Sequence, residues 1–232
     1  MAVNLFAAAR SSSSIGLGHN VAAMSVEPTS TPPAEAAGRG RIKGAAFREF
    51  VAWVEQDRGA EALGRLAASL PADVSHHFVV SRPALGLLPA TWYAAEVVHA
   101  FLDALTEGAS EPELARMARE GAEFTMERNL RGVYRSLFGL FVSPRIYAMG
   151  VQQLWNLHYD SGRVVIVEPS PNTHRAAIHG WRGHHPFACR LNMEAAFPLY
   201  GAMKCRDVTV RREACVSNGD TACGWVITWN AR

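Results

Sequence analysis

The feature that most constrains this chain is a pair of cysteines, Cys215 and Cys223, on either side of a turn sequence near the C-terminal end. The turn, Ser-Asn-Gly-Asp at 217–220, contains the Asn and Gly that readily adopt the left-handed conformations of a tight hairpin. From Cys223 onward, Cys, Trp, Ile and Trp recur at every second position, which is the period of a strand with one buried face. The sequence therefore predicts a β-hairpin that sets the two cysteines directly opposite one another.

A third cysteine, Cys189, lies in a stretch with helical character and can bring a further sulfur to the same face of the hairpin. Converging thiolates are a common ligand set for one metal ion, and structural zinc takes four tetrahedral nitrogen or sulfur ligands. Two other interpretations stay open. The cysteines can pack as small buried apolar residues, or Cys215 and Cys223 can form a disulfide, which a reducing compartment disfavours. Cys205 is left unassigned.

The composition is that of an ordinary globular protein, with 49% hydrophobic and 9% aromatic residues in a chain of 232. The 23 basic and 21 acidic residues nearly balance and are interleaved along the predicted helices, so we expect no nucleic-acid partner. No apolar run approaches the roughly 18 residues of a membrane span, and no signal peptide is recognisable. With only four cysteines, too few for a secreted disulfide scaffold, the protein is expected to be cytoplasmic.

The order of predicted elements indicates an α+β fold, in which N-terminal helices pack on an antiparallel sheet with one inserted helix. Residues 1–41 are rich in Ala, Ser, Pro, Thr and Gly without a period, which predicts a disordered leader, and 42–232 are expected to form a single domain. Gly59 and Pro71 end the first two helices, and Thr91 and Ser110 are predicted N-caps. The predicted helices cover 44–58, 60–69, 92–108, 110–127, 129–142, 143–160 and 184–200, and the predicted strands cover 163–168, 173–181, 207–215 and 222–229.

This order of elements and the tail Cys-x7-Cys-x-Trp-x3-Trp resemble a paralogous family of uncharacterised myxobacterial proteins over about residues 41–231. The tail also resembles the 4-vinyl reductase domain, whose fold is shared with haem nitric-oxide-binding proteins and with subunits of the vesicle-tethering TRAPP complex. The resemblance implies a superfamily that mostly binds ligands and does not catalyse reactions. The residues that carry it are Trp92, Tyr93, Tyr134, Arg135, Ser143, Pro144, Trp155, Cys189, Cys215, Gly219, Cys223 and Trp229.

The resemblance also implies a metal site, because phenol-responsive regulators with a 4-vinyl reductase domain hold a structural zinc with three cysteines and one glutamate. The cysteines of that pattern correspond to Cys189, Cys215 and Cys223, and zinc is accordingly the candidate cofactor. The glutamate would stand three residues before Cys215, where this chain has Arg212. Glu213 is one place away and should point to the opposite face of the strand. His184, His185, Cys205 or water are the remaining candidates for a fourth ligand.

Four histidines near Trp181, at positions 174, 179, 184 and 185, invite a metal or haem interpretation, although most such histidines are solvated loop residues. The Tyr-x-Ser-x-Arg pattern by which the nitric-oxide-binding relatives hold the haem propionates is absent. Ser143-Pro-Arg-Ile-Tyr147 contains the same residue types in a different order. We therefore expect no haem.

Aromatic side chains along the predicted helices are candidates for an apolar pocket between helices and sheet, although aromatic stripes are also typical of a plain core. The candidate ligand-binding residues are Trp92, Tyr93, Tyr134, Phe138 and Trp155. No nucleophile elbow, phosphate loop or dinucleotide fingerprint occurs, so we expect no enzyme. The sequence favours a sensory, signalling or ligand-binding domain for a small apolar or aromatic molecule. A homodimeric protein-interaction module without a small ligand is the alternative.

Overall fold

The computed structural model describes residues 40–130, 138, 139 and 141–230. The described residues belong to one compact unit. The predicted leader therefore lies almost entirely outside the described residues, as does most of the helix predicted over 129–142, including Tyr134 and Arg135.

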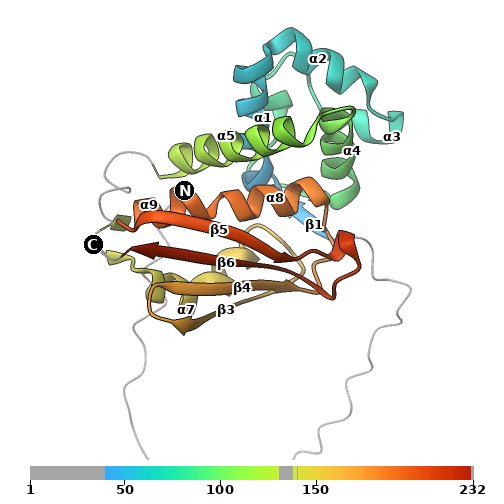
Figure 1. Cartoon of the computed structure of the whole chain (residues 1–232). Coiled ribbons are helices and arrows are strands. Elements are labelled where there is room, and N and C mark those ends of the chain that lie inside the picture. Colours follow the sequence, from blue (N-terminus) through green and yellow to red (C-terminus); the bar gives the residue numbers. More distant parts are fainter. Residues whose placement is uncertain (1–39, 131–137, 140, 231–232) are drawn as a thin grey trace, which may run out of the picture. The chain divides into compact units, whose positions relative to one another are not determined.

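A four-stranded antiparallel sheet forms one layer, with the strand order β3-β4-β6-β5 (Figure 1). Its strands are β3 (Arg163–Ser170), β4 (Thr173–His179), β5 (Arg206–Ala214) and β6 (Ala222–Asn230). Burial alternates along β6, where Cys223, Trp225, Ile227 and Trp229 are all buried, so one face of the sheet is covered. The predicted α+β class with an antiparallel sheet is confirmed, and so is the period-two pattern of the last strand.

Three helices pack against the sheet: α7 (Pro144–Asn156) on β3, and α8 (Pro186–Glu194) with α9 (Ala196–Ala202) on β5. The side chain of Ser143 accepts a hydrogen bond from the backbone N–H of Ile146 and so caps α7. A single helix was predicted over 184–200, but the chain forms two. Ala195 ends α8 and directly precedes α9.

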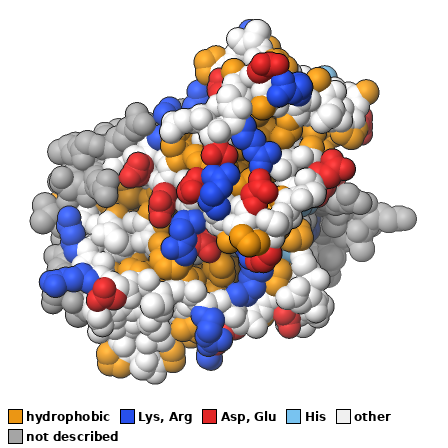
Figure 2. Space-filling view, turned by 45° about the horizontal axis from the view of Figure 1, so that its top comes forward, with side chains coloured by type: hydrophobic (Ala, Val, Ile, Leu, Met, Phe, Trp, Pro, Cys, Tyr) orange, Lys and Arg blue, Asp and Glu red, His pale blue; other side chains and the backbone are white. Residues whose placement is uncertain are grey.

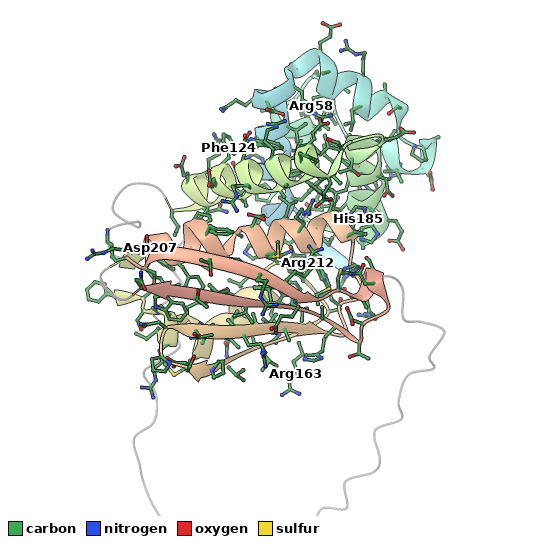
Figure 3. The ribbon with its side chains drawn as sticks, viewed as in Figure 1. Arg58, Phe124, Arg163, His185, Asp207 and Arg212 are labelled. Carbon is green, nitrogen blue, oxygen red and sulfur yellow. The ribbon has the colours of Figure 1, made fainter. Side chains whose placement is uncertain are left out.

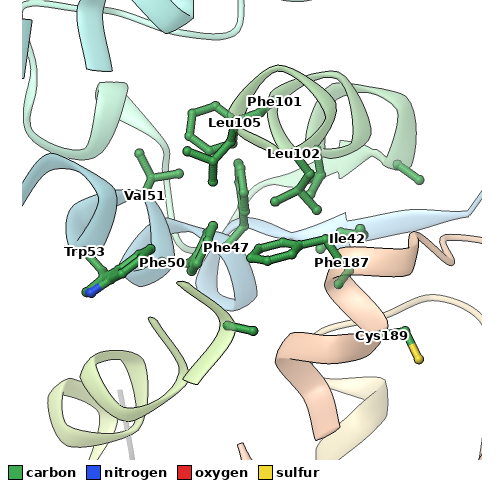
Figure 4. Close-up of a cluster of buried hydrophobic side chains, with 14 of the residues drawn as sticks. Ile42, Phe47, Phe50, Val51, Trp53, Phe101, Leu102, Leu105, Phe187 and Cys189 are labelled. Atoms are coloured by element: carbon green, nitrogen blue, oxygen red, sulfur yellow. The ribbon is translucent and has the colours of Figure 1, made fainter. Parts of the chain in front are cut away.

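The remaining helices form a further layer on α8, with α5 lying along it (Figure 1). They are α1 (Gly44–Arg58), α2 (Ala60–Ser69), the short α3 (Ala72–Ser75), α4 (Ala95–Thr106) and α5 (Glu111–Asn129), with 3₁₀ turns η3 (Pro83–Gly86) and, in the hairpin loop, η4 (Val216–Asn218). Aromatic rings join the two layers, since Phe50 of α1 lies 5.8 Å from Phe187 of α8 between ring centroids. Figure 4 shows Phe187 with this cluster and the sulfur of Cys189 pointing away from it.

A short strand that local patterning did not predict, β1 (Arg41–Lys43), pairs antiparallel with β2 (Trp92–Ala94). Thr91 was predicted to cap a helix, and this is wrong. Residues 92–94 use their backbone groups to pair with β1, so α4 starts only at Ala95.

The same strand β1 also contacts the segment that precedes β3. Ile42 forms an isolated antiparallel bridge with Tyr159, and the backbone N–H of Lys43 donates to the carbonyl of His158 at 2.8 Å. The carboxylate of Asp160 accepts hydrogen bonds from the backbone N–H of Arg41 at 2.7 Å and from its guanidinium at 3.0 Å. Residues 41–43 therefore connect the helical layer to the sheet.

On the face seen in Figure 2, basic and acidic side chains are interspersed. The alternation agrees with the nearly equal numbers of the two charge types in the sequence. None of the helices in the described part of the chain is both long enough and apolar enough to cross a membrane.

Gly44, at the start of α1, tests the packing there, and Gly150 in α7 serves as the comparison. A Cβ added at Gly44 would lie 2.1 Å from the carbonyl oxygen of Leu88, whereas a Cβ at Gly150 in α7 would meet nothing within 4 Å. We expect Gly44→Ala to lower the free energy of unfolding by roughly 1–3 kcal/mol through overpacking, and Gly150→Ala to raise it by roughly 0.5–1 kcal/mol. Urea unfolding of both variants checks this, and equal effects would contradict the described contact.

Candidate functional site

Four side chains with metal-binding atoms meet between α8 and the end of the β5–β6 hairpin: His184, Cys189, Cys215 and Cys223. Their ligand atoms all lie within 4.8 Å of one another. The sulfur of Cys215 is 3.9 Å from that of Cys189, 4.0 Å from that of Cys223 and 3.7 Å from Nε2 of His184. The three predicted cysteines are thus brought together, and a histidine completes a set of four.

Cys189 is positioned by the start of α8, whose N-terminus is formed by a proline at the first helical position. The Nδ1 atom of His185 accepts a hydrogen bond from the backbone N–H of Phe187 at 3.1 Å, so His185 is the N-cap of this helix. Phe187 and Cys189 are both buried but point to different sides of the helix (Figure 4). The capped first turn therefore presents the Cys189 sulfur to the sheet.

Cys215 follows directly after β5, in the loop of the hairpin. Its backbone N–H donates to the carboxylate of Asp220 at 2.8 Å, and Gly219 closes the turn in a left-handed conformation with φ of 90°. The register shift near the end of β5 pairs Ala214 with Gly224, so the next position along the hairpin sets Cys215 opposite Cys223, as expected. The two sulfurs are 4.0 Å apart, well beyond the roughly 2.05 Å of a disulfide bond.

His184 is delivered by a turn between β4 and α8, in which its backbone N–H donates to the carbonyl of Trp181 at 3.2 Å. The Trp181 ring is buried and stands edge-on to the His184 ring, with the centroids 5.4 Å apart. The turn and this aromatic contact fix the imidazole close to the sulfurs.

The spacing of the four atoms suits a tetrahedral ion. With Zn–S bonds of about 2.3 Å, two sulfurs of a tetrahedral site are separated by about 3.8 Å. The sulfur separations that include Cys215 are 3.9 and 4.0 Å, and the cluster is a three-sulfur, one-nitrogen set of the kind that structural zinc sites use. The residues present therefore fit a zinc ion.

Hydrogen bonding among the cysteines favours one thiolate within the cluster. A hydrogen bond from Cys189 lowers the pKa of the Cys223 thiol to about 4, against the opposing effect of burial, and a hydrogen bond from His184 adds to the lowering. The same Cys189–Cys223 hydrogen bond, together with burial, raises the pKa of Cys189. These contacts thus favour the thiolate form of Cys223, and thiolates are the form that binds metals.

Arg212 lies beside this cluster, on the covered side of the sheet opposite Trp225 (Figure 3). Its positive charge favours the thiolate of Cys189 and so opposes the rise in the pKa of that thiol. One guanidinium nitrogen, Nη2, is buried without a hydrogen-bond partner among the described residues. Three thiolates and one divalent ion would leave a net charge of −1, which Arg212 offsets. Glu213 points the other way, to Arg175 and Arg211 on the open face.

The other histidines predicted near Trp181 do not join the cluster. His174 is buried under the sheet with its Nδ1 atom 2.6 Å from the hydroxyl of Tyr200, and His179 is exposed. His185 lies next to His184 in sequence but points towards α4, where its Nε2 atom is 3.0 Å from the carboxylate of Asp103. Cys205 lies outside the cluster, beyond the end of α9.

A cavity of about 120 Å³ lies on the opposite side of α8, between that helix and α1, α4 and α5. Its walls are mainly apolar. The lining residues are Ile42, Ala46, Phe47, Phe50, Val98, Leu102, Ala122, Thr125, Met126, Tyr159, Ala188, Leu191, Asn192 and Ala195.

Two polar groups in the cavity wall face one another. The amide nitrogen of Asn192 donates to the hydroxyl of Tyr159 at 3.3 Å and to the carbonyl of Ala188 at 2.9 Å. In the hydrogen bonds of the described residues, the amide oxygen of Asn192 takes no part and the Tyr159 hydroxyl only accepts. This pair therefore offers one hydroxyl donor and one carbonyl acceptor. Burial raises the pKa of Tyr159, which keeps the hydroxyl protonated.

The aromatic residues predicted to bind a ligand lie elsewhere. Trp92 packs beside Lys43, Tyr93 accepts a hydrogen bond from the backbone N–H of Leu88, and Phe138 lies against the core. Trp155 is buried and donates its indole N–H to the carbonyl of Ser161. None of these described residues lines the cavity, and Tyr134 lies outside the described residues.

Sequence reasoning missed Asn192, although a signal was present. Ala188, Leu191 and Ala195 recur at helical spacing and predict one apolar face of α8. Asn192 interrupts that face, and a polar residue within an apolar stripe is where a specific contact to a ligand is to be sought.

The class that fold and site define is an α+β domain with a partly open apolar cavity and a cysteine-rich cluster. A scan against family models gives no match, and a search of curated proteins gives none either. Among solved structures, an H-NOX protein from S. oneidensis in the Fe(II)NO ligation state covers 82% of this chain and 100% of its own, with 13% identity and a TM-score of 0.59.

Two further solved structures give the same result. An unliganded Fe(II) H-NOX protein from K. algicida covers 82% of this chain and 98% of its own, with 14% identity and a TM-score of 0.59. A protein studied for the function of haem distortion in the H-NOX family covers 82% and 96%, with 10% identity and a TM-score of 0.58. At these identities the likeness establishes a shared fold. It does not distinguish the 4-vinyl reductase domain or support the myxobacterial family.

The expectation of no haem is corrected by these comparisons. It rested on a missing sequence pattern, whereas the structures that share this fold are H-NOX proteins, one of them studied for its haem. A fold that holds haem elsewhere gives no ground for the exclusion. As it stands the cavity is too small for a porphyrin, because its volume of about 120 Å³ is comparable to that of a cavity of about 150 Å³ that holds a single benzene ring in another protein. A haem would require the surrounding helices to separate.

The buried His174 predicts a pH dependence of stability. Burial lowers its pKa from 6.5, partly opposed by Glu168, so the unfolded chain binds a proton that the folded chain resists. Stability should therefore fall as the pH decreases below about 6.5, by at most about 1.4 kcal/mol per pH unit for this proton. We expect His174→Gln to reduce that slope in urea unfolding measured at several pH values. His179→Gln, on the exposed side of the same strand, should leave the slope unchanged, and equal slopes in both variants would refute the assignment.

Proposed function

We propose that this chain is a cytoplasmic, non-enzymatic sensory or ligand-binding domain that takes a small, mainly apolar or aromatic molecule into the cavity beside α8. The observation that carries the proposal is the cavity itself, a mainly apolar space of about 120 Å³ whose wall includes the polar side chains of Thr125, Tyr159 and Asn192. Sites for small molecules generally combine apolar walls with a few placed polar groups. Among the described residues that line the cavity, Tyr159 alone has a titratable side chain, which supports binding over acid–base catalysis.

The size and chemistry of the cavity suggest the class of ligand. An apolar cavity of about 150 Å³ in another protein binds benzene, so about 120 Å³ suits a single small ring or a short branched chain. The Tyr159 hydroxyl and the Asn192 amide oxygen can together bind one hydroxyl or carbonyl group. A charged ligand is disfavoured, because none of the described residues in the wall has a charged side chain.

The second part of the proposal is a structural zinc ion held by His184, Cys189, Cys215 and Cys223. The ion would join the turn before α8, the first turn of α8 and both arms of the hairpin. Such a site stabilises a fold directly, because its ligands are brought together only in the folded chain.

A protein-interaction module remains the second candidate, and one observation favours it. Ile146, Met149 and Leu157, on and just after α7, are about half exposed or more, at 49%, 70% and 51%. An exposed apolar surface of this kind is typical of a contact with another protein. A homodimer through this surface stays a prediction.

For the metal, we expect one zinc ion per chain, with X-ray absorption giving three sulfurs at about 2.3 Å and one nitrogen at about 2.0 Å. His184→Ala should lower zinc affinity at least tenfold, because one ligand is lost. His179→Ala removes an exposed histidine that is not part of the cluster and should leave zinc binding unchanged. A metal-free wild-type protein after addition of zinc, or an unchanged shell in His184→Ala, would rule the site out.

For the cavity, we expect toluene and phenol to raise the melting temperature of the protein, because a ligand that binds only the folded state stabilises it. Phenol should have the larger effect per bound molecule, since its hydroxyl can pair with Asn192 and Tyr159. Ala122→Leu should abolish both shifts by filling the cavity. Ala148→Leu adds the same bulk on α7, away from the cavity, and should preserve them. Absence of any shift in the wild type would argue against this ligand class.

A further inference from the structure

Helix α4 forms hydrogen bonds with Gly183 and His185, the two residues on either side of His184 in the sequence. The Nε2 atom of His99 donates a hydrogen bond to the carbonyl of Gly183 at 3.1 Å. On the other side, Nδ1 of His185 is already an acceptor, so its Nε2 carries the hydrogen and donates to Asp103 at 3.0 Å. His99 and Asp103 are four residues apart and therefore share one face of α4. His184, the candidate metal ligand, therefore lies between two residues that are hydrogen-bonded to this face of α4. His185 is labelled in Figure 3.

The same helix also forms part of the cavity. Val98 and Leu102, each directly preceding one of the two polar residues, line it and are almost completely buried. Their Cβ positions are also four residues apart, so they make up a second face of α4. A displacement of α4 that loosens its hold on the turn at 183–185 also moves this wall of the cavity.

Helix α8 makes a second connection between the two sites. Cys189 lies in the metal cluster, while Ala188, Leu191 and Asn192 of the same helix line the cavity. The helix has nine residues, so its two faces move together as one short rigid element. Asn192 also carries the amide that pairs with Tyr159.

We propose that metal occupancy controls the cavity, with His99 and Asp103 acting as positioning residues that couple the two sites. An ion bound to His184 and Cys189 fixes the turn at 183–185 and α8, and through the contacts of α4 it fixes two walls of the cavity. Ligand and metal then favour the same arrangement and bind with positive coupling, which is reciprocal by thermodynamic linkage. The inference rests on the proposed function, because it assigns a regulation to the same cavity and cluster.

The test measures zinc affinity by competition with a chelator, with and without toluene as the cavity probe. In the wild type we expect toluene to increase zinc affinity by about fivefold or more, the usual range for coupled sites. The double variant His99→Phe with Asp103→Ala should still bind one zinc ion and toluene, but its zinc affinity should not respond to toluene. His99→Gln alone retains a donor for Gly183 and should keep most of the coupling. Glu107→Ala, which removes an exposed acid at the end of α4, is the control and should behave as wild type.

A toluene effect of equal size in the wild type and the double variant would overturn the proposal, as would no effect in the wild type. Failure of the cavity proposal can be distinguished from failure of the coupling, because toluene would then not shift the melting temperature of the zinc-loaded protein at all. In that case hydrogen exchange decides. Zinc should slow the amides of α4 in the wild type and not in the double variant, with α2 as an internal reference, and equal protection in both proteins would reject the coupling.

Discussion

The structure depends on the burial of α8 between two layers. This helix has nine residues, too few to be stable alone in water, so its formation relies on contacts on both sides. Phe187 packs on Phe50 of the helical layer, and Cys189 reaches the sulfur cluster at the sheet. Both candidate sites are formed against this one element.

Much of the architecture could be predicted from local sequence, because its causes are local. Gly59 ends α1 and opens α2 as expected, and the turn around Gly219 forms the predicted hairpin. The pairing of 92–94 with 41–43 could not be predicted from either segment, since neither is long enough to show a strand period and each depends on the other. The fold class followed from element order, whereas the strand pairs that involve short distant segments did not.

In the candidate site, too, some features could be predicted from local sequence and others depend on segments that are far apart in the chain. The spacing of Cys189, Cys215 and Cys223 predicted that three sulfurs meet, because a hairpin and a preceding helix leave few arrangements. The place of His184 depends on a turn stabilised by Trp181, and its neighbour His185, identical in type, points elsewhere. The cavity draws on four helices that span residues 44–194, so no single stretch of the chain reveals it. The fold shared with H-NOX proteins at 10–14% identity likewise leaves the chemistry to individual side chains.

The contact of β1 with the segment 158–160 has a consequence for the order of folding. Arg41 and Asp160 are separated by 119 positions, and the loop between them includes every helix of the outer layer. During synthesis, residues 41–43 leave the ribosome well before their partners at 158–160 exist, so α1 to α5 can associate with β1 and β2 while the sheet is still absent. Contacts of such long range are costly in chain entropy and form late. The topology therefore favours assembly of the helical layer before closure of the segment 158–160 onto β1, the contact that joins this layer to the segment leading into the sheet.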